Sequence, residues 1–498
     1  MGPQQLHTTL GPLDHIPPRN YVKFAMYLPL KPDVDTITVF DQLHEGLHRA
    51  CLQFPWLRGK VHWQPQDVAG SRPGQLEIRY SPPDEAQPRP YQFKYNVIET
   101  APEYEEIAEL GFPTNTFRDS ELLWAPFMPS VDDGAEVFVA QANFIPGGCI
   151  LCAAIFHSAS DGTATATFFK VWADYCKTAL SMTGDESART FSLPDGSDDR
   201  GLLDYLWKKE GSGRLVKEID PSTWHILGLD TPSAISDVSA IESDGKGLET
   251  NMVLPTRKMN SHIFYISPEN FAQLRTECLQ LTRATGDSTG NISGNDALCA
   301  LIWQGLMRAR LRAKVSSNVE ENSPLSCLEM TLDGRPDFST SLPPTYLGNV
   351  TLINQSFFPL SELASTQTAI SEVARVIREN GSRIHPESVL DAYTLVKNIP
   401  DYNQLKLRFT TVEGNDMMIT SLLKFPSNVS FGSEFFEDDG RPAAVRPLME
   451  GFEMFFRICF ILPMKSHGGI EFVVSLYDDE MEKLLQDEEF GKYAMLLC

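Results

Sequence analysis

The chain has 498 residues, of which 42% are hydrophobic and 10% aromatic, and its formal net charge is −24 at pH 7. A chain of this length exceeds the size at which a single hydrophobic core usually keeps growing, so two domains are expected. The strong negative charge argues against nucleic acid and anionic membrane surfaces as partners, because both repel an acidic protein.

The N-terminal residues contain neither the basic region nor the apolar region of a signal peptide, and no apolar run of the sequence is long enough to span a membrane. The nine cysteines lie mostly in apolar runs, which is typical of reduced thiols in the cytosol. The sequence therefore predicts a cytoplasmic protein without a membrane partner.

The first predicted elements are a strand over Val22–Leu28 and a helix over Val39–Cys51. Within this helix, the run from His44 and Glu45 to His48 matches the H-E-x-x-H pattern of zinc proteases. Zinc also needs a third protein ligand, and the nearest downstream carboxylates lie in turn-like or strand-like sequence. We interpret the two residues as exposed helix histidines, and a zinc-dependent hydrolase is the alternative function.

The most informative stretch begins with the apolar run Cys149–Phe156, which predicts a buried strand. His157 follows this run directly, and a helical pattern begins after Asp161 and Gly162. A histidine at the rigid end of a strand is well placed for catalysis, and its ordinary pKa of about 6.5 suits a base near neutral pH.

A long connection follows, Met182–Asn251, which is rich in Asp, Ser, Gly and Pro. Such a segment predicts a domain boundary. The second half begins with a strand over His262–Ile266 and a helix from Pro268. The G-x-S-x-G match around Ser288 lacks the strand before it and the helix after it that a nucleophile elbow requires, so we interpret it as a surface loop.

The remaining elements of the second half are predicted from their periodicity. They are a long helix capped by Ser293, a strand over Leu325–Leu332, helices over Leu360–Glu379 and Glu387–Lys397, a strand over Met417–Leu423, and a strand pair over Phe455–Leu462 and Ile470–Leu476.

Three of these segments together resemble the BAHD superfamily of acyl-CoA-dependent acyltransferases. They are H-x-x-x-D-G at 157–162, S-x-N-D-A with a following W and R-A-R at 293–310, and D-G-R-P with P-P-x-Y-x-G-N at 333–349. The nearer resemblance is to the fungal branch, which includes the trichothecene 3-O-acetyltransferases. The resemblance runs from Pro12 to about Tyr493 with the motifs in the expected order.

The resemblance implies an α/β (α+β) fold of two chloramphenicol-acetyltransferase-like domains, each a mixed sheet flanked by helices, with the active site at their interface. The expected division is residues 1–200 for the N-terminal domain, 201–255 for the crossover connection and 256–498 for the C-terminal domain. A monomer is expected.

The resemblance also implies the chemistry. His157 is the expected general base, which deprotonates a hydroxyl as it attacks the thioester of acyl-CoA, with acetyl-CoA the expected donor. Thr420 and Ser421 are candidates for stabilising the oxyanion. Arg257, Lys258 and Ser293 are candidates for binding the coenzyme A phosphates.

In the resembled family, the motif aspartate holds its loop through a salt bridge and turns away from the substrate, so Asp161 is expected to be structural. Gly162 is expected to permit a tight turn. The plant members carry D-F-G-W-G, whereas this chain has Ser430 in place of the aspartate that pairs with the D-x-R arginine. The partner of Arg335 is therefore left open.

The expected partners are acyl-CoA as a co-substrate and a hydroxylated small molecule, a terpenoid or polyketide, and no tightly bound cofactor or metal is expected. Because the thioester already carries an activated acyl group, direct transfer within a ternary complex is expected, with no acyl intermediate on Ser158, Ser160 or Ser288. A catalytically silent, metabolite-binding member of the fold is a further alternative.

Overall fold

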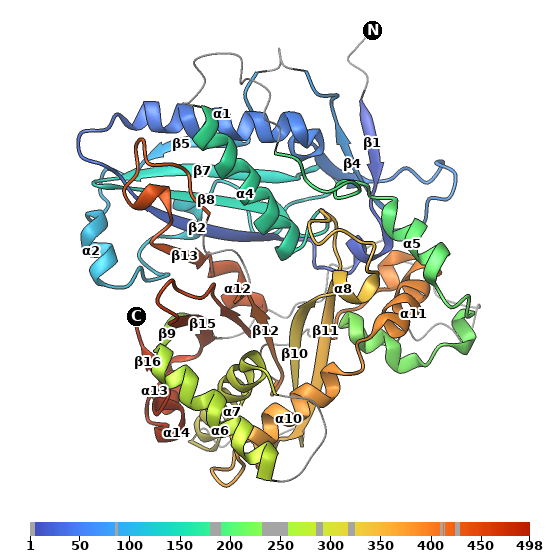
Figure 1. Cartoon of the computed structure of the whole chain (residues 1–498), viewed down its shortest axis with the longest axis vertical. Coiled ribbons are helices and arrows are strands. Elements are labelled where there is room, and N and C mark those ends of the chain that lie inside the picture. The colour runs from blue at the N-terminus through green and yellow to red at the C-terminus, as the bar shows by residue number, and fades with distance from the viewer. Residues whose placement is uncertain are drawn as a thin grey trace.

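The computed structural model describes residues 5–84, 88–179, 191–231, 257–284, 292–316, 324–408, 412, 414–423 and 429–498. Figure 1 shows an upper and a lower half, each built around a sheet with helices on it. The Ser288 loop and part of the predicted connection, residues 182–190 and 232–251, lie outside the described residues.

The upper half is built on a five-stranded sheet in the order β13-β2-β8-β7-β5. Its strands are β13 (Ala444–Pro447), β2 (Tyr21–Pro29), β8 (Gly148–Phe156), β7 (Phe138–Ile145) and β5 (Phe93–Val97). Every residue of β8 is buried, because β2 and β7 pair with it on both sides. The predicted buried strand before His157 is therefore present, at the centre of the sheet.

Two long helices, α1 (Thr36–Gln53) and α4 (Gly162–Ala179), cover one face of this sheet (Figure 1). They approach closely at Gly46, where an added Cβ would lie 2.9 Å from the backbone nitrogen of Cys176. A side chain at this position would therefore separate the helices. A smaller four-stranded sheet lies beside them and contains β1 (Leu6–Thr9), β4 (Leu76–Tyr80), β3 (Lys60–Trp63) and β6 (Ala135–Glu136).

The lower half contains a seven-stranded mixed sheet in the order β11-β10-β12-β14-β15-β9-β16. Its strands are β11 (Thr351–Pro359), β10 (Leu325–Asp333), β12 (Met417–Ser421), β14 (Ile458–Ile461), β15 (Ile470–Leu476), β9 (Asn260–Ile266) and β16 (Ala494–Leu496). β12 runs parallel to both β10 and β14, and the other pairs are antiparallel.

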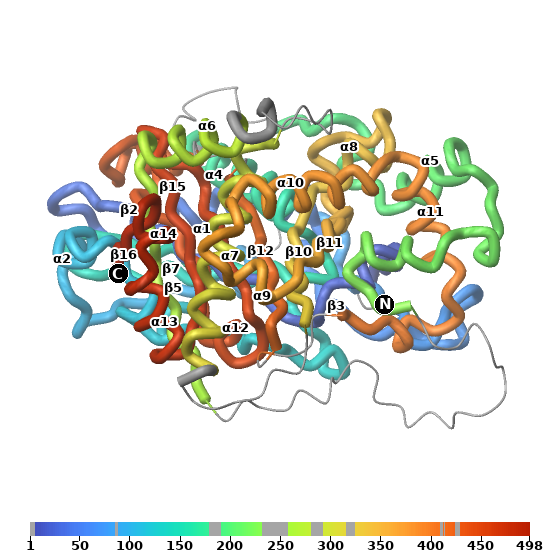
Figure 2. The backbone as a smooth tube through the Cα atoms, turned by 90° about the horizontal axis from the view of Figure 1, so that it is seen from below, coloured from blue at the N-terminus to red at the C-terminus, as the bar shows by residue number. Residues whose placement is uncertain are grey.

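Helices cover the outer face of this sheet, as the view from below shows (Figure 2). They are α6 (Pro268–Ala284), α7 (Gly294–Ser316), α10 (Ile370–Gly381), α13 (Asp478–Leu485) and α14 (Glu488–Gly491). α7 is the central helix of this layer, and the Trp303 side chain on it is fully buried. An apolar helix of this length is stable in water only when neighbours surround it, as here.

The two halves are not separate along the chain. β13 belongs to the C-terminal part of the sequence, yet it pairs with β2 in the upper sheet. Phe431 and Phe436, which precede it, lie in the hydrophobic core of the upper half. The chain therefore returns to the N-terminal half between β12 and β14, and this exchange ties the halves together.

A third hydrophobic cluster joins the halves at one end of the molecule, where α5 and α11 lie in Figure 1. It contains η1 (Pro12–His15), α5 (Leu202–Glu210), η4 (Pro221–Leu227) and α11 (Pro386–Lys397). The remaining short elements are η2 (Pro55–Arg58), α2 (Tyr104–Glu109), α3 (Asp119–Leu122), η3 (Val216–Glu218), α8 (Arg335–Phe338), α9 (Leu360–Leu363), η6 (Tyr402–Gln404), η7 (Asp438–Gly440) and α12 (Glu450–Phe455).

The predicted helix over Leu360–Glu379 is wrong in one respect. It is divided into α9 and α10, with a turn between them. In this turn the Ser365 hydroxyl accepts a hydrogen bond from the backbone nitrogen of Gln367 at 3.1 Å, which competes with the helical pattern. Among the helices of the described residues, none combines the length and the apolar character that a membrane crossing requires.

Candidate active site

His157 lies directly after the central strand β8, and the backbone on both sides of it is fixed. Its backbone nitrogen donates to the carbonyl oxygen of Asn20 at 3.0 Å. Its own carbonyl oxygen accepts from Nδ2 of Asn349 at 3.1 Å. Asn349 thus connects the histidine to the lower half, while Asn20 connects it to the start of β2. Rigid positioning of this kind suits a catalytic side chain.

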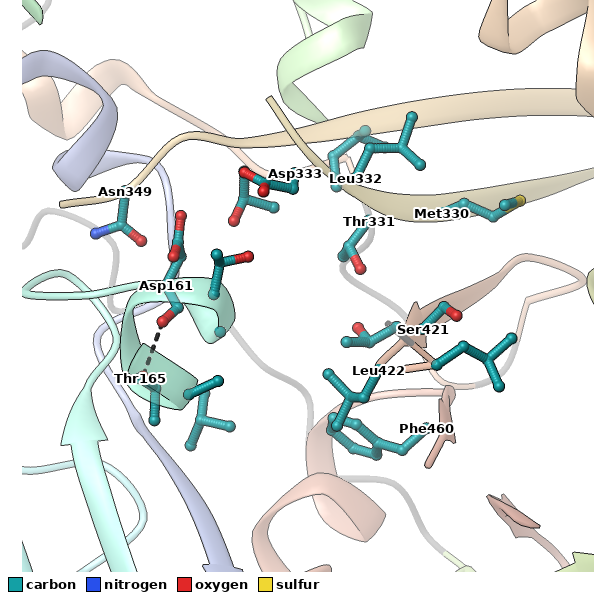
Figure 3. Close-up of a pocket in the computed structure, with 18 of the residues that line it drawn as sticks. Asp161, Thr165, Met330, Thr331, Leu332, Asp333, Asn349, Ser421, Leu422 and Phe460 are labelled. Carbon is teal, nitrogen blue, oxygen red and sulfur yellow. Dashed lines mark hydrogen bonds between the residues drawn. The ribbon is translucent and has the colours of Figure 1, made fainter. Parts of the chain in front are cut away.

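His157 faces a large cavity of about 1310 Å³ between the two halves. Figure 3 shows Asp161 and Thr165 at the start of α4 on one side of it. Thr331 of β10 and Ser421 and Leu422 at the end of β12 lie across the gap. The volume exceeds the roughly 300–1,000 Å³ of common small-molecule pockets. The cavity therefore has room for two substrates at once.

Asp161 points into a network of donors rather than toward His157. Its two carboxylate oxygens accept from Nη1 and Nη2 of Arg335 at 3.0 and 2.8 Å. They also accept from the backbone nitrogens of Val350 at 2.9 Å and Ala164 at 3.0 Å. The salt bridge implied by the resemblance is therefore present. The Nδ1 atom of His157 is buried and has no partner among the described residues.

This network also identifies the partner of Arg335, which the sequence left open. Besides Asp161, the guanidinium binds the Asp333 carboxylate at 2.8 Å and the carbonyl oxygens of Tyr346 and Gly348. Ser430 lies elsewhere, because its hydroxyl donates to the carbonyl oxygen of Asp439. The arginine therefore has a full set of partners without the aspartate of the plant motif.

The position of Gly162 differs from the expectation of a tight turn. It is the first residue of α4 and is not among the described glycines with a positive φ. Asp161 immediately precedes Gly162, and its carboxylate accepts a hydrogen bond from the backbone nitrogen of Ala164, as the side chain of an N-cap residue does. The chain therefore changes from strand to helix through this cap, without a left-handed glycine.

Burial in the cavity wall lowers the pKa of His157 to about 4, and the charge of Asp161 opposes this only in part. The charged imidazolium would lose hydration here and gain no hydrogen-bonded counter-ion. The pKa of His157 is therefore lower than the ordinary histidine value of about 6.5 that the sequence analysis assumed. His157 is neutral, and able to accept a proton, throughout the physiological pH range.

Thr420 and Ser421 line the cavity on the side of the lower sheet. The Ser421 hydroxyl donates to Oδ1 of Asn295 at 2.7 Å, so its proton is already engaged. Thr420 is half-buried at the end of β12. Of the two residues predicted to stabilise the oxyanion, Thr420 is therefore the better candidate, because its hydroxyl does not make the Asn295 hydrogen bond that engages Ser421.

Ser293 lines the same cavity at the start of α7. Its hydroxyl accepts from the backbone nitrogen of Asp296 at 3.2 Å. Arg257 and Lys258 are not among the residues that line the cavity. Arg257 pairs with Asp479, and the Lys258 ammonium lies 3.7 Å from the Glu453 carboxylate. Three cations that the sequence analysis did not single out, Lys170, Arg275 and Arg378, do line it.

Two family models match the chain. One, described as the transferase family, matches residues 234–491, and the other, the trichothecene 3-O-acetyltransferase-like N-terminal domain, matches residues 20–176. The chain belongs to the transferase family. The predicted membership of the fungal branch and the predicted enzyme class, an acyl-CoA-dependent O-acyltransferase, are confirmed.

Relatives of this transferase are fungal proteins of secondary metabolism. The isocyanide synthase-NRPS hybrid crmA of Aspergillus fumigatus is 29% identical over 98% of this chain, which spans 31% of that protein's length. The eremophilane O-acetyltransferase ORF8 of Penicillium roqueforti is 26% identical, with 98% of both chains covered.

Solved structures show the same fold. Trichothecene 3-O-acetyltransferase TRI101 of Fusarium sporotrichioides, complexed with coenzyme A and T-2, has a TM-score of 0.71 at 22% identity. The match covers 99% of this chain and 100% of that one. TRI101 of F. graminearum, complexed with coenzyme A and deoxynivalenol, has a TM-score of 0.73 at 20% identity, with the same coverage. The predicted α/β fold is therefore confirmed.

The H-E-x-x-H match in this transferase is a structural part of α1. Nε2 of His44 donates to the carbonyl oxygen of Pro90 at 2.8 Å, and Glu45 pairs with Arg49 at 2.9 Å. The expectation of exposed histidines is wrong, since His44 is half-buried and His48 is buried against the upper core. No group of metal-ligating side chains large enough for a zinc site occurs in the described part of the chain.

The sequence did not identify two functional residues at the cavity. Asn349 belongs to the P-P-x-Y-x-G-N motif, and its side-chain amide links His157 to Asp14, whose carboxylate accepts from it at 2.9 Å. Glu329 lines the cavity from the middle of β10. The available signal was a charged residue within an otherwise apolar strand, where an unpaired charge is costly.

Proposed function

We propose that this transferase moves an acyl group, expected to be acetyl, from acyl-CoA to a hydroxyl of a secondary metabolite, with His157 as the general base. The observation that carries the proposal is a neutral histidine at the end of a rigid central strand, facing a cavity of about 1310 Å³ between the two halves. The family supplies the reaction class.

In the proposed step, the acceptor oxygen forms a bond to the thioester carbonyl carbon while its proton passes to His157. We assign the proton to Nε2, because Nδ1 is buried. Collapse of the tetrahedral species then breaks the carbon–sulfur bond. The coenzyme A thiolate leaves and takes the proton from His157. The Thr420 hydroxyl, which lines the cavity, is the proposed donor to the oxyanion.

For coenzyme A, we propose that the phosphate groups approach Ser293 and the N-terminus of α7, with Arg275 and Arg378 nearby. All of them line the cavity. The first turn of a long helix offers unpaired backbone N–H groups, and its dipole favours negative charge. This assignment replaces Arg257 and Lys258, which are not among the residues that line the cavity.

The proposed acceptor is a hydroxylated terpenoid or polyketide. The eremophilane and trichothecene O-acetyltransferases support this proposal as relatives, and the cavity wall is rich in apolar side chains that suit such a skeleton. They include Val22, Phe24, Ile353, Phe452, Phe456 and Phe460.

We further propose that residues 1–200 and 256–498 act as two domains joined by the segment 201–255, with β13 exchanged between them. The enzyme is proposed to be a cytoplasmic monomer. Light scattering on the purified protein and fractionation of the producing cells test these two points. A zinc hydrolase gains no support from any described residue, and neither does a silent binding protein.

The reaction is tested by incubating the purified protein with acetyl-CoA and a panel of hydroxylated sesquiterpenoids that includes deoxynivalenol and T-2. Free thiol released from acetyl-CoA and the mass of the acylated product are measured together. Acceptor-dependent thiol release with a matching product supports the proposal. The absence of both with acetyl, malonyl and longer acyl donors across the panel would refute it.

A further inference from the structure

Glu329 is a carboxyl group in the cavity wall that the transfer reaction does not use. It lies in the middle of β10, opposite Gln355 on β11 and beside Met418 on β12. Its side chain is 2% exposed, and it lines the cavity. Its chain neighbours Leu328 and Met330 belong to the core under the helices, so Glu329 lies on the opposite, inner face of the sheet.

The polar atoms of Glu329 and Gln355 are incompletely paired. Nε2 of Gln355 donates to Oε1 of Glu329 at 2.7 Å. Oε1 of Gln355 is buried and has no partner among the described residues. Buried acceptors that lack a donor are unfavourable, and the loss is recovered when a ligand supplies one. Glu329 lines the cavity, and Gln355, which lies behind it on β11, holds an acceptor oxygen that still lacks a donor.

Charges of both signs act on Glu329. Arg408 favours its ionised form, whereas Asp416 and Asp230 oppose it. Burial is the dominant influence and raises the pKa of Glu329 to about 7. A bound ammonium group would shift this carboxyl to its ionised form, while a hydroxyl can donate to either form.

The position along β10 separates Glu329 from the strand end that contacts the Asp161–Arg335 pair. Asp333, at the end of the strand, binds Arg335, which in turn holds Asp161. Four residues of a strand separate Glu329 from Asp333, or roughly 13 Å. Thr331 lies between them and points into the gap in Figure 3.

Apolar side chains also line the cavity, among them Leu227, Ile353, Leu407 and Met418. Met418 lies directly beside Glu329 in the sheet. A few polar groups in an apolar pocket are what orients a ligand, since a buried polar group rejects a ligand that leaves it unpaired. A carboxyl at this place would reject an acceptor that is apolar along its whole length.

We propose that Glu329 and Gln355 form a second acceptor subsite, which binds a hydrogen-bond-donating group of the acceptor, a hydroxyl or an ammonium, away from the hydroxyl that reacts at His157. The proposal rests on the proposed function and extends it. The acceptor is then bifunctional, with one group acylated at His157 and a second group bound beside Glu329.

Three probes of equal chain length test the subsite: 1-decanol, 1,10-decanediol and 10-amino-1-decanol. Binding to the coenzyme A-saturated enzyme is measured by calorimetry, and acetyl transfer to each probe is measured in parallel. An apolar cavity alone would favour 1-decanol, the most hydrophobic probe. The subsite predicts the reverse, with the diol and the amino alcohol bound roughly tenfold more tightly.

The variants separate the two donor types. Glu329→Leu should remove the preference for both polar probes. Glu329→Gln keeps an acceptor oxygen but no charge, so it should retain the preference for the diol and lose that for the amino alcohol if the bound group is an ammonium. Glu372→Gln, an exposed substitution on α10, is the matched control for the charge change.

Equal binding of all three probes, or a preference that survives Glu329→Leu, would overturn the subsite, provided that circular dichroism shows the variant to be folded. Should Glu329→Leu fail to fold, Gln355→Met provides the same comparison. A probe preference that depends on Glu329, without any acyl transfer, would support the subsite and contradict the proposed function.

Discussion

Asp161 and Arg335 form a buried, bidentate ion pair across the two halves of the chain, with nitrogen–oxygen distances of 2.8 and 3.0 Å. Their side chains are 2% and 1% exposed. Asp161 follows His157 by four residues, at the start of α4, whereas Arg335 follows strand β10 of the lower sheet. The pair therefore fixes the loop that carries His157 against the opposite wall of the cavity.

Replacing Asp161 by alanine should destabilise the protein by about 3–5 kcal/mol, because the buried Arg335 guanidinium would lose its buried counter-charge and keep only the part-exposed Asp333. Chemical denaturation measures this free energy. The double variant Asp161→Leu with Arg335→Met should lose less, since it leaves no buried unpaired charge. Glu379→Ala breaks the half-exposed pair with Arg375 and should cost only about 0.5 kcal/mol. A stable, inactive Asp161→Ala protein would instead indicate a direct His–Asp dyad.

Replacing His157 by alanine should lower kcat about 100- to 10,000-fold, the usual contribution of a general base. The melting temperature and the affinity for coenzyme A should stay close to those of the parent. Stopped assays of thiol release measure kcat, and calorimetry measures the melting temperature and the affinity for coenzyme A. His467, which is exposed, is the control histidine. Activity within a few-fold of the parent would remove His157 from the mechanism.

The pH dependence of kcat/KM should show no histidine inflection near 6.5. Since the folded pKa of His157 is lowered to about 4, the base is already neutral at pH 6, and its protonation reduces the rate only as the pH falls toward 4. The profile is best measured in the Glu329→Gln variant, because the pKa of Glu329 is about 7 and its titration would overlap the range of interest. An inflection between 6 and 7 in that background would contradict the burial of His157.

Glu329→Gln should stabilise the protein at pH 8 and have little effect at pH 4. The folded pKa of Glu329, about 7, lies above its ordinary value of 4.5. The folded state thus holds the proton more tightly, and stability falls as the pH rises from 4.5 to 7. The full difference is on the order of 3 kcal/mol, an upper limit, since one pKa unit is worth about 1.4 kcal/mol. A pH-independent effect of the substitution would contradict the raised pKa.

Initial-rate kinetics should give intersecting double-reciprocal lines, as expected for direct transfer in a ternary complex. A covalent route would give parallel lines and a burst of coenzyme A without acceptor. Neither serine near His157 is well placed to be the nucleophile of a covalent route. The Ser158 hydroxyl is buried without a partner among the described residues, and the Ser160 hydroxyl donates to the carbonyl oxygen of Leu347 at 3.2 Å. Trapping a stoichiometric acyl-serine from acetyl-CoA alone would overturn this mechanism.

The sequence by itself determined the local parts of this protein. The apolar run before His157 and the helical spacing after Gly162 predicted β8 and α4, because period and capping residues act over a few positions. The cap at Ser293 was predictable for the same reason. The family could also be recognised from the sequence, because its motifs occur in a fixed order along the chain.

The tertiary structure decided whatever depends on residues far apart in the chain. It gave Arg335 its partner 174 positions away, inserted β13 into the upper sheet, and left Arg257 outside the cavity. It also set the pKa of His157 and placed Glu329 in the cavity wall. Which faces of two sheets meet, and how much water they exclude, is a property of the packed whole, and charge and protonation follow from that exclusion.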